Sequence, residues 1–409
     1  MYDKIDKESD RMNLVDSLND RQKEAVVNTD GPMLILAGAG SGKTKVLTTK
    51  VAYLIEEKNI DPNNILAITF TNKAAKEMKE RIFKLEGNSA FYIQISTFHS
   101  FGLKILKENC ELLGYEKNFT ILDSDDSLSI IKKIMKELNI DANKYNPKAI
   151  KNVISNNKNE IIDPEKYSLY VNTDFDEIAL EVYRKYEKSL KINNAVDFDD
   201  LLILPLKLFN NNPGVLQKYQ EKYKYVFIDE YQDCNNLQRQ AIDAIFDPQK
   251  CAVFKIGDSD QAIYNSAENT TPDWIPQPDF LPIMTSCRFN QEIANVLCKL
   301  KKGEKNIITL AGETGVKPVL LVFSPENIDR VIGGFISALD RHELYDDNGI
   351  YKAIGAIKKE DSAGLKIGSY WTKFDGSANK KNEYSYWVLV DEIVQYLLEG
   401  KLYKAEQSV

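Results

Sequence analysis

Residues 31–58, "GPMLILAGAGSGKTKVLTTKVAYLIEEK", decide the fold, because they predict an apolar strand, a glycine-rich turn and a helix in direct succession. Residues 65–87 and 91–115 repeat the order of strand, loop and helix. Apolar strands return at residues 223–230 and 251–258. Strands that alternate with helices typically form a parallel sheet with crossover helices. We therefore predict an α/β fold built on a parallel sheet.

The turn itself, "AGAGSGKT", has the residue types and spacing of a phosphate-binding loop. Its glycines allow backbone N–H groups to point at phosphate oxygens, Lys43 would reach the β- and γ-phosphates, and Thr44 would hold Mg²⁺. A glycine-rich turn without a ligand is the alternative, but the strand before the turn and the helix after it argue against that. We predict a P-loop NTPase that uses ATP and Mg²⁺. The residues expected to bind the nucleotide are Ala37, Gly38, Ala39, Gly40, Ser41, Gly42, Lys43 and Thr44.

Two adjacent carboxylates, Asp229 and Glu230, end the apolar strand at residues 223–230. In a P-loop sheet such a strand end supplies the carboxylate that holds Mg²⁺, usually through water, so we assign this role to Asp229. Glu230 would polarise the attacking water. Both acids can stay ionised because Mg²⁺ and Lys43 offset their charge. An acidic cap of the next helix is the alternative, but a cap needs one acid and not two.

Composition excludes several other classes of protein. The 409 residues are 43% hydrophobic and 28% charged, which is typical of a soluble globular chain of two or three domains. The net charge of −8 argues weakly against a broad basic surface, although a local basic groove remains compatible with it. Five cysteines without paired spacing and two histidines indicate reduced thiols and no zinc cluster. Without a signal peptide or a membrane-spanning run, we expect a cytoplasmic protein that uses no membrane.

Six motifs occur in a characteristic order, and together they carry a family resemblance. They are "LNDRQKEAVV", "AGAGSGKT", "ITFTNKAAKEM", "STFHSFG", "DFDDLL" and "VFIDEYQDCN". The chain resembles the superfamily 1A DNA helicases of the UvrD/Rep/PcrA type, closely over about residues 18–290. The resemblance implies RecA-like domains and an ATP-dependent helicase or translocase that moves 3′ to 5′ on single-stranded DNA. Its partners would be single-stranded DNA, a duplex junction and a nuclease or repair protein. Its pathway would be DNA repair, replication restart or phage defence.

The resemblance also assigns roles to single residues. Gln22 would read adenine, while Gln261 and Arg288 would sense the γ-phosphate. The implied catalytic set is Lys43, Asp229, Glu230, Gln261 and Arg288. The implied DNA-binding set is Phe70, Thr71, Asn72, Thr97, Phe98, His99 and Tyr264.

From the residues alone, aromatic side chains at strand ends are compatible with base stacking worth about 1–3 kcal/mol each. Core packing is the alternative for Phe70, Phe98 and Phe101, and the residues alone favour it for two of the three. For His99, a hydrogen-bonded structural histidine is an equal alternative. Residues 148–160 of the helical region could meet duplex phosphates, but a plain solvated helix is favoured there.

By resemblance, residues 1–17 are an N-terminal arm. Residues 18–102 and 197–278 form the ATPase domain, residues 103–196 a helical insertion, and residues 279–409 a partial second RecA-like domain. Within that last part, residues 285–300 and 317–324 are compatible with a second α/β domain.

The chain departs from the family pattern at several places. Asn265 and Ser266 stand where the family has a base-stacking tryptophan, for which Trp274 is a displaced substitute, and Cys287 replaces an aromatic that covers adenine. No arginine follows Arg341, although the family ends with an arginine motif worth about 10³–10⁵ in rate. Residues 351–376 dimly resemble UvrD-like helicases that accompany OLD-type nucleases.

Two functions from different classes remain open on this sequence. The first is an ATP-dependent DNA motor, with turnover in doubt because the arginine motif is missing. The second is a nucleotide-gated DNA-binding subunit, or a truncated helicase, with little unwinding of its own. A small-molecule phosphotransferase with the same loop would leave "TNKAAKEM" and "DEYQD" without explanation.

Overall fold

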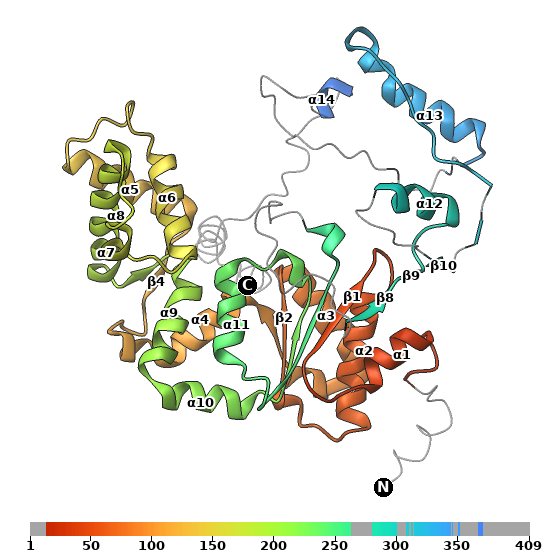
Figure 1. Ribbon diagram of the computed structural model, residues 1–409, viewed down its shortest axis with the longest axis horizontal. Helices are drawn as coiled ribbons and strands as arrows, with labels where there is room; N and C mark the ends of the chain where they lie inside the picture. The colour runs from red at the N-terminus through yellow and green to blue at the C-terminus, as the bar shows by residue number, and fades with distance from the viewer. Residues whose placement is uncertain are drawn as a thin grey trace, which may run out of the picture. The chain divides into compact units, whose positions relative to one another are not determined.

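The computed structural model describes residues 14–262, 280–300, 308–310, 312–313, 315–344, 346, 351 and 367–370. The chain divides into two compact units, residues 1–314 and residues 315–409. All elements that bear on the predicted site, α1 to β10, belong to the first unit (Figure 1).

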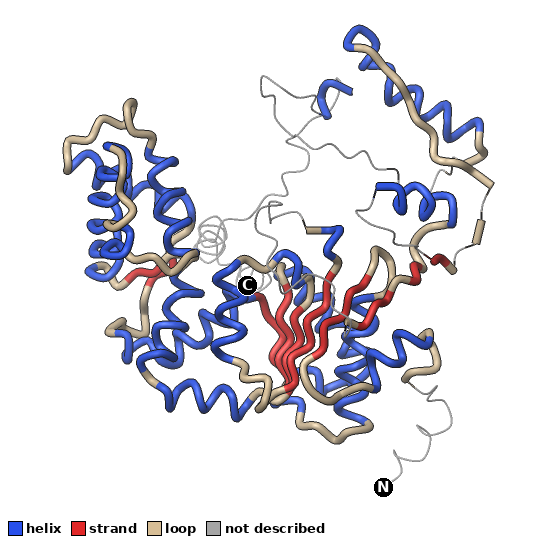
Figure 2. Tube along the Cα trace, viewed as in Figure 1, coloured by secondary structure: helices blue, strands red, loops and turns tan. Residues whose placement is uncertain are grey.

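A six-stranded sheet, red in Figure 2, forms the centre of the first unit. Its strand order is β3-β2-β6-β7-β1-β8. Every neighbouring pair in it is parallel. This confirms the predicted α/β fold with a parallel sheet. The strands are β1 (Met33–Ala37), β2 (Ile65–Thr69), β3 (Gln94–Thr97), β6 (Tyr225–Ile228), β7 (Ala252–Gly257) and β8 (Leu281–Ile283).

Helices cover both faces of the sheet, and alternate strand residues point to two different cores. In β6, Phe227 packs with the first core and Val226 with the second; in β1, Ile35 and Leu36 divide in the same way. The first core is covered by α1 (Asp20–Val27), α2 (Lys43–Glu56) and α3 (Asn72–Glu86). The second is covered by α4 (Phe98–Asn109), α9 (Asp200–Asn211), α10 (Pro213–Lys222) and α11 (Asn236–Ile245).

The last strand of the sheet, β8 (Leu281–Ile283), lies beyond the boundary predicted for the first domain. β8 was expected in the second domain, after residue 278, but it pairs with β1 through Ile35 and Leu281. Leu281 and Ile283 are buried in the same core as Ile35 of β1. Burial of these two apolar side chains favours the pairing of β8 with β1. The chain then continues into β9 (Thr285–Ser286), α12 (Gln291–Leu300) and β10 (Ile308–Thr309).

The helical segment between β3 and β6 has a core of its own. Its members are α5 (Ser124–Glu137), α6 (Pro147–Asn159), α7 (Pro164–Tyr167) and α8 (Asp174–Ile192). The short parallel pair β4 (Thr120–Ile121) and β5 (Ala195–Val196) joins the two ends of this segment. The chain therefore leaves and re-enters the α/β part at neighbouring points.

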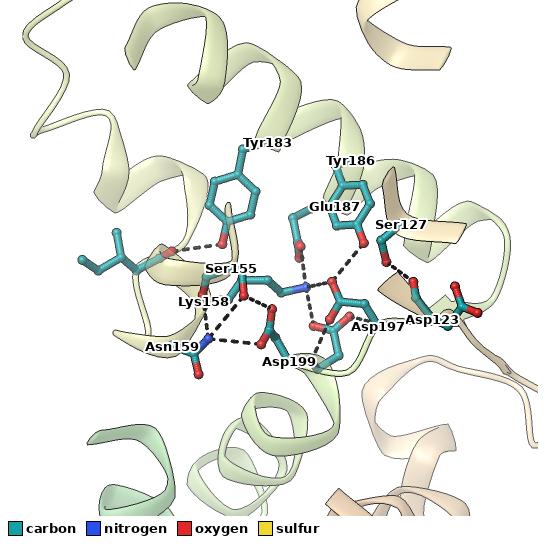
Figure 3. A network of polar contacts seen from close by, with 12 residues as sticks. Asp123, Ser127, Ser155, Lys158, Asn159, Tyr183, Tyr186, Glu187, Asp197 and Asp199 are labelled. Atoms are coloured by element: carbon teal, nitrogen blue, oxygen red, sulfur yellow. Dashed lines mark hydrogen bonds and ion pairs between the residues drawn. The ribbon is translucent and has the colours of Figure 1, made fainter. Parts of the chain in front are cut away.

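Lys158 of α6 fastens this helical segment where the chain returns (Figure 3). Its Nζ lies 2.9 Å from Glu187 Oε1, 2.8 Å from Asp197 Oδ2 and 2.8 Å from Asp200 Oδ1. Burial would lower the pKa of Lys158, but the three carboxylates outweigh it and hold that pKa well above its usual value. The prediction of a plain solvated helix at residues 148–160 is therefore wrong at Lys158, which is buried.

The same helix also contacts the helix that follows the predicted catalytic acids. Asn235, the N-cap of α11, donates from Nδ2 to Asn159 Oδ1 at 3.0 Å. Its neighbour Asn236 donates to Glu160 Oε2 at 2.9 Å. The segment is thus hydrogen-bonded to the α/β part at two separate places, the Asp197–Asp200 return and the start of α11.

The second unit contains the 3₁₀ helix η8 (Pro325–Arg330), α13 (Val331–Arg341) and α14 (Ile367–Tyr370) among its described residues. Residues 317–324, assigned above to a second α/β domain, form no strand there, and Leu320 and Val322 are exposed. A strand needs a pairing edge, and the described part of this unit supplies none. Across the described ranges, no helix is long and apolar enough to cross a membrane. Tyr264 and Trp274, singled out above, lie outside the described residues.

Candidate active site

The phosphate loop connects the carboxyl end of β1 to the first residue of α2. Gly40 and Gly42 adopt left-handed backbone conformations, with φ of 74° and 83°, which other residues rarely adopt. Gly42 is the N-cap of α2, so the loop closes onto a helix N-terminus. Such an end presents unpaired N–H groups and partial positive charge, which favours an anion.

The segment that carries Arg288 lies directly against this loop. Gly38 N donates to Ile283 O at 2.9 Å, and Cys287 N donates to Gly40 O at 3.0 Å. A Cβ added at Gly40 would lie 2.5 Å from both Arg288 Cβ and Ser286 Oγ, so the close approach requires glycine. The structure therefore brings the backbone of Arg288 beside the loop, although it lies far along the chain.

Gln22 contacts the loop from the other side. Its Nε2 donates to Ser41 O at 2.8 Å, and its Oε1 accepts from Asn19 N at 3.1 Å within the capping box of α1. The side chain is buried, and its Nε2 would lie 2.9 Å from a Cβ at Gly42. In this arrangement Gln22 supports the loop, and its remaining amide hydrogen is the group that could still meet a base.

The acids lie at the end of β6, two strands away from β1 in the sheet. Lys43 Nζ contacts Glu230 Oε2 at 3.1 Å, which joins the loop to the acids. Asp229 is 6% exposed, and burial, followed by the neighbouring charge of Glu230, raises its pKa to about 6 despite the opposite influence of Lys43. The site therefore holds more negative charge than its own cation offsets.

A hydrogen-bonded series links these acids to the end of β7. Gln232, in the 3₁₀ turn η4 (Tyr231–Asp233), donates from Nε2 to Glu230 Oε2 at 2.8 Å. Its Oε1 accepts from Asp258 N at 2.9 Å. Asp258 Oδ2 in turn accepts from Gln261 Nε2 at 2.6 Å. The structure thus brings together Lys43, Glu230 and Gln261, which sequence reasoning had assigned separately.

Two observations fit the loop and acids to a magnesium nucleotide. Ser41 Oγ is buried and has no hydrogen-bond partner among the described residues, so a loop hydroxyl remains available to a ligand. Burial and, second, the charge of Glu230 raise the pKa of Asp229, and a divalent cation bound at the carboxylate would favour its charged form against both effects. Mg²⁺ keeps several waters and needs few protein ligands, and the Thr44 hydroxyl and the Asp229 carboxylate are of the right chemistry.

The described members of the predicted DNA-binding set lie at the ends of β2, which neighbours β6 in the sheet, and of β3, which neighbours β2. Because all strands are parallel, their carboxyl ends share one edge of the sheet with the phosphate loop and the acids. Thr71 and Asn72 are exposed at the start of α3, and Phe70 is half-buried. This edge carries both candidate sets.

The segment after β3 departs from expectation. Phe98 is 6% exposed and packs in the second core, so its ring is not available for stacking on a base. Thr97 is also buried, and its hydroxyl accepts from Ser100 N as the N-cap of α4. Phe101 is core as well, in agreement with the preference that the residues alone indicated for two of the three aromatics.

His99 has an aromatic neighbour that sequence reasoning missed. The ring of Phe198 lies 5.9 Å from that of His99, edge to face, and Phe198 is 51% exposed. Burial lowers the pKa of His99, against the raising effect of Asp199. The sequence did contain a sign of Phe198, because in "DFDDLL" this aromatic residue stands between aspartates. Acidic neighbours on both sides are not expected for a phenylalanine in a buried strand. Gln232 was missed because its partner, Asp258, lies far along the chain.

Comparison with known proteins gives a consistent result. The family model described as "UvrD/REP helicase N-terminal domain" matches residues 18–270. The chain is 48% identical over 252 residues to a protein of Bacillus subtilis strain 168 named ATP-dependent DNA helicase PcrA, covering 61% of this chain and 34% of that protein. Proteins of the same name from Staphylococcus epidermidis RP62A and Staphylococcus aureus Mu50 are 47% and 46% identical over 253 residues, with the same coverage. The chain spans about a third of the length of these curated relatives.

Proposed function

The chain belongs to the UvrD/REP helicase family, and from this premise we propose that it is an ATP-dependent motor that moves on single-stranded DNA. One observation carries the proposal. The phosphate loop, the paired acids and the candidate DNA residues all lie at one edge of a single parallel sheet. The acids at the end of β6 are next to the end of β2 in the sheet, and β3 follows on the far side of β2.

At the nucleotide end, Lys43 would bind the β- and γ-phosphates, and Thr44 and Asp229 would hold Mg²⁺. The bound magnesium nucleotide supplies the phosphoryl group and neutralises the charge on it. Glu230 would accept a proton from the attacking water, and its contact with Lys43 places that carboxylate beside the phosphate loop. The remaining members of this proposed set are Gln22, Gln261 and Arg288, with the loop residues Ala37 to Gly42.

At the DNA end, Thr71 and Asn72 offer exposed polar groups, and Phe70 and His99 offer rings at neighbouring strand ends. We add Phe198 to this set because its exposed ring is adjacent to His99. Stacking on such rings tolerates any base, which suits a motor that must pass over every sequence. The 3′-to-5′ direction, a duplex junction as the working substrate and the division into ATPase domain and helical insertion follow from the resemblance and are part of the proposal.

Two measurements on the same preparation test it. Lys43→Met should abolish single-strand-dependent ATP hydrolysis, whereas Lys45→Met, an exposed neighbour in the same helix, should leave it unchanged. Displacement of a strand from a tailed duplex, coupled to hydrolysis, supports a motor. ATP-dependent DNA binding without displacement supports a nucleotide-gated DNA-binding subunit instead, and hydrolysis indifferent to DNA would refute both.

A further inference from the structure

We propose that Gln232 is a positioning residue that holds Glu230 in place and ties it to the Asp258–Gln261 turn. This inference rests on the proposed function, because it assigns the general-base role to Glu230. Gln232 is 3% exposed and lies between the ends of β6 and β7. Its two amide groups face different partners: Nε2 donates to Glu230 Oε2 at 2.8 Å, and Oε1 accepts from Asp258 N at 2.9 Å.

The chemistry of these two contacts requires a primary amide. One partner is a carboxylate, which needs a donor, and the other is a backbone N–H, which needs an acceptor. Leucine supplies neither group, glutamate supplies only the acceptor, and asparagine has both but is shorter by one methylene. A buried residue that uses both ends of one amide in this way connects its two partners rigidly.

Glu230 needs such support because its own backbone is unusual. It has φ of 50° and ψ of 44°, a left-handed conformation that non-glycine residues seldom adopt. Its carboxylate makes contacts to Lys43 and Gln232, and both use Oε2. When Lys43 binds phosphate, Gln232 becomes the contact that keeps this carboxylate aimed. Oε1 accepts no hydrogen bond from the described residues and would be the oxygen that receives the proton from water.

Through Asp258 N, Gln232 is hydrogen-bonded to the turn that carries Gln261. The carboxylate of Asp258 accepts from Asp260 N at 3.0 Å and from Gln261 Nε2 at 2.6 Å, so the turn η5 (Ser259–Gln261) is organised around Asp258. A shift of Gln261 toward a γ-phosphate would move Asp258, and Gln232 would pass that shift to Glu230. The alignment of the base would then depend on where the γ-phosphate holds Gln261.

Three variants test this link. Gln232→Leu removes both contacts, and Gln232→Glu keeps the acceptor for Asp258 N while placing a second carboxylate against Glu230. Gln238→Leu is the matched control, because Gln238 is also buried and hydrogen-bonded but serves the capping box of α11. The measurements are the Kd for a non-hydrolysable ATP analogue, the turnover of ATP on single-stranded DNA, and hydrogen exchange of residues 252–262 with and without the analogue.

We expect Gln232→Leu to lower turnover by about 10- to 100-fold, the effect of losing one hydrogen bond to a charged group, with the Kd nearly unchanged. The analogue should alter hydrogen exchange of residues 252–262 in the parent chain and not in Gln232→Leu. For Gln232→Glu, turnover relative to the parent should rise as the pH falls, because two neighbouring carboxylates share a proton that restores the donor. Because protonation relieves any buried glutamate, the readout that separates positioning from a merely structural role is the hydrogen exchange of residues 252–262.

Turnover of Gln232→Leu within about twofold of the parent, or an equal loss in Gln238→Leu, would overturn the inference. A parent chain that binds no nucleotide would refute the proposed function instead. In that case the positioning role of Gln232 is tested by hydrogen exchange of the ligand-free chain. Gln232→Leu should speed exchange of the Asp258 amide, which loses its acceptor, and Gln238→Leu should not. Equal exchange in both variants would overturn it.

Discussion

The buried charge of Asp229 makes the strongest prediction: Asp229→Asn should stabilise the ligand-free protein at neutral pH while it damages nucleotide binding. The pKa of Asp229 is raised to about 6, chiefly by burial, whereas an unfolded aspartate titrates near 3.9. Because the folded-state pKa lies above the unfolded value, the carboxyl group costs no unfolding free energy below pH ~4, where it is protonated in both states. The unfolding free energy then falls as the pH rises through about 6, where the folded protein must ionise this buried group. Two units correspond to about 3 kcal/mol of unfolding free energy lost at pH 7.5.

Asparagine keeps the oxygen that accepts from Glu230 N and removes the charge. Urea unfolding at pH 7.5 without nucleotide should therefore show Asp229→Asn more stable than the parent by about 1–3 kcal/mol, with roughly half that gain at pH 5. Asp61→Asn is a control of opposite sign, because the hydrogen bond from Asn63 N lowers the pKa of exposed Asp61. A ligand at 100 times its Kd raises the unfolding free energy of a protein by about 2.7 kcal/mol. A magnesium nucleotide should therefore raise the unfolding free energy of the parent by this amount, and that of Asp229→Asn by less.

The reasoning would be refuted if Asp229→Asn were less stable than the parent at pH 7.5 without nucleotide. It would also be refuted if the gain did not shrink toward pH 5. A parent chain that gains no stability from a magnesium nucleotide would remove the functional explanation for keeping this charge buried.

Three further predictions concern the rest of the account. Lys158→Met should lower the unfolding free energy by about 3–5 kcal/mol in urea, because it leaves the buried carboxylates of Asp197 and Asp200 and the half-buried one of Glu187 without their cation. A loss below about 1 kcal/mol would contradict that assignment. Gly40→Ala should weaken Mg·ATP binding at least about tenfold, because the added Cβ would collide with the segment after β8. Gly31→Ala is the control, since Gly31 has a similar φ and a Cβ there would meet no atom within 4 Å. Equal Kd values for the two variants in a nucleotide titration would exclude the collision. Phe198→Ala should weaken single-stranded DNA binding by about 1–3 kcal/mol in fluorescence anisotropy, and the exposed Phe91→Ala should have no effect; the reverse order would relocate the DNA path.

The parallel sheet was predictable because its signals are local. The phosphate loop follows its strand directly, and the carboxylates Asp229 and Glu230 follow theirs, so residue order alone places each at a strand end. Strand order was not predictable in this way. β8 joins β1 across some 240 residues of chain, and only the pairing of Ile35 with Leu281 reveals the place where the sheet ends.

Single side chains were harder to predict, because burial depends on partners from distant parts of the chain. Phe98 was compatible with base stacking until the helices α9 and α11 were seen to cover it. Lys158 had the sequence context of a solvated helix, and its burial depends on Asp197 and Asp200, which come about 40 residues later. Gln232 likewise requires Asp258. These are the positions where tertiary contacts override local pattern.

The central claim is that ATP hydrolysis at Lys43, Asp229 and Glu230 responds to single-stranded DNA at the neighbouring strand ends. Steady-state ATP hydrolysis by the chain and by Glu230→Gln, each with and without single-stranded DNA, tests it most directly. The account predicts a several-fold rise with DNA in the parent, and a rate lower by about 10²–10⁴-fold in Glu230→Gln with nucleotide binding retained. A parent rate that does not respond to DNA, or a Glu230→Gln rate equal to that of the parent, would contradict it.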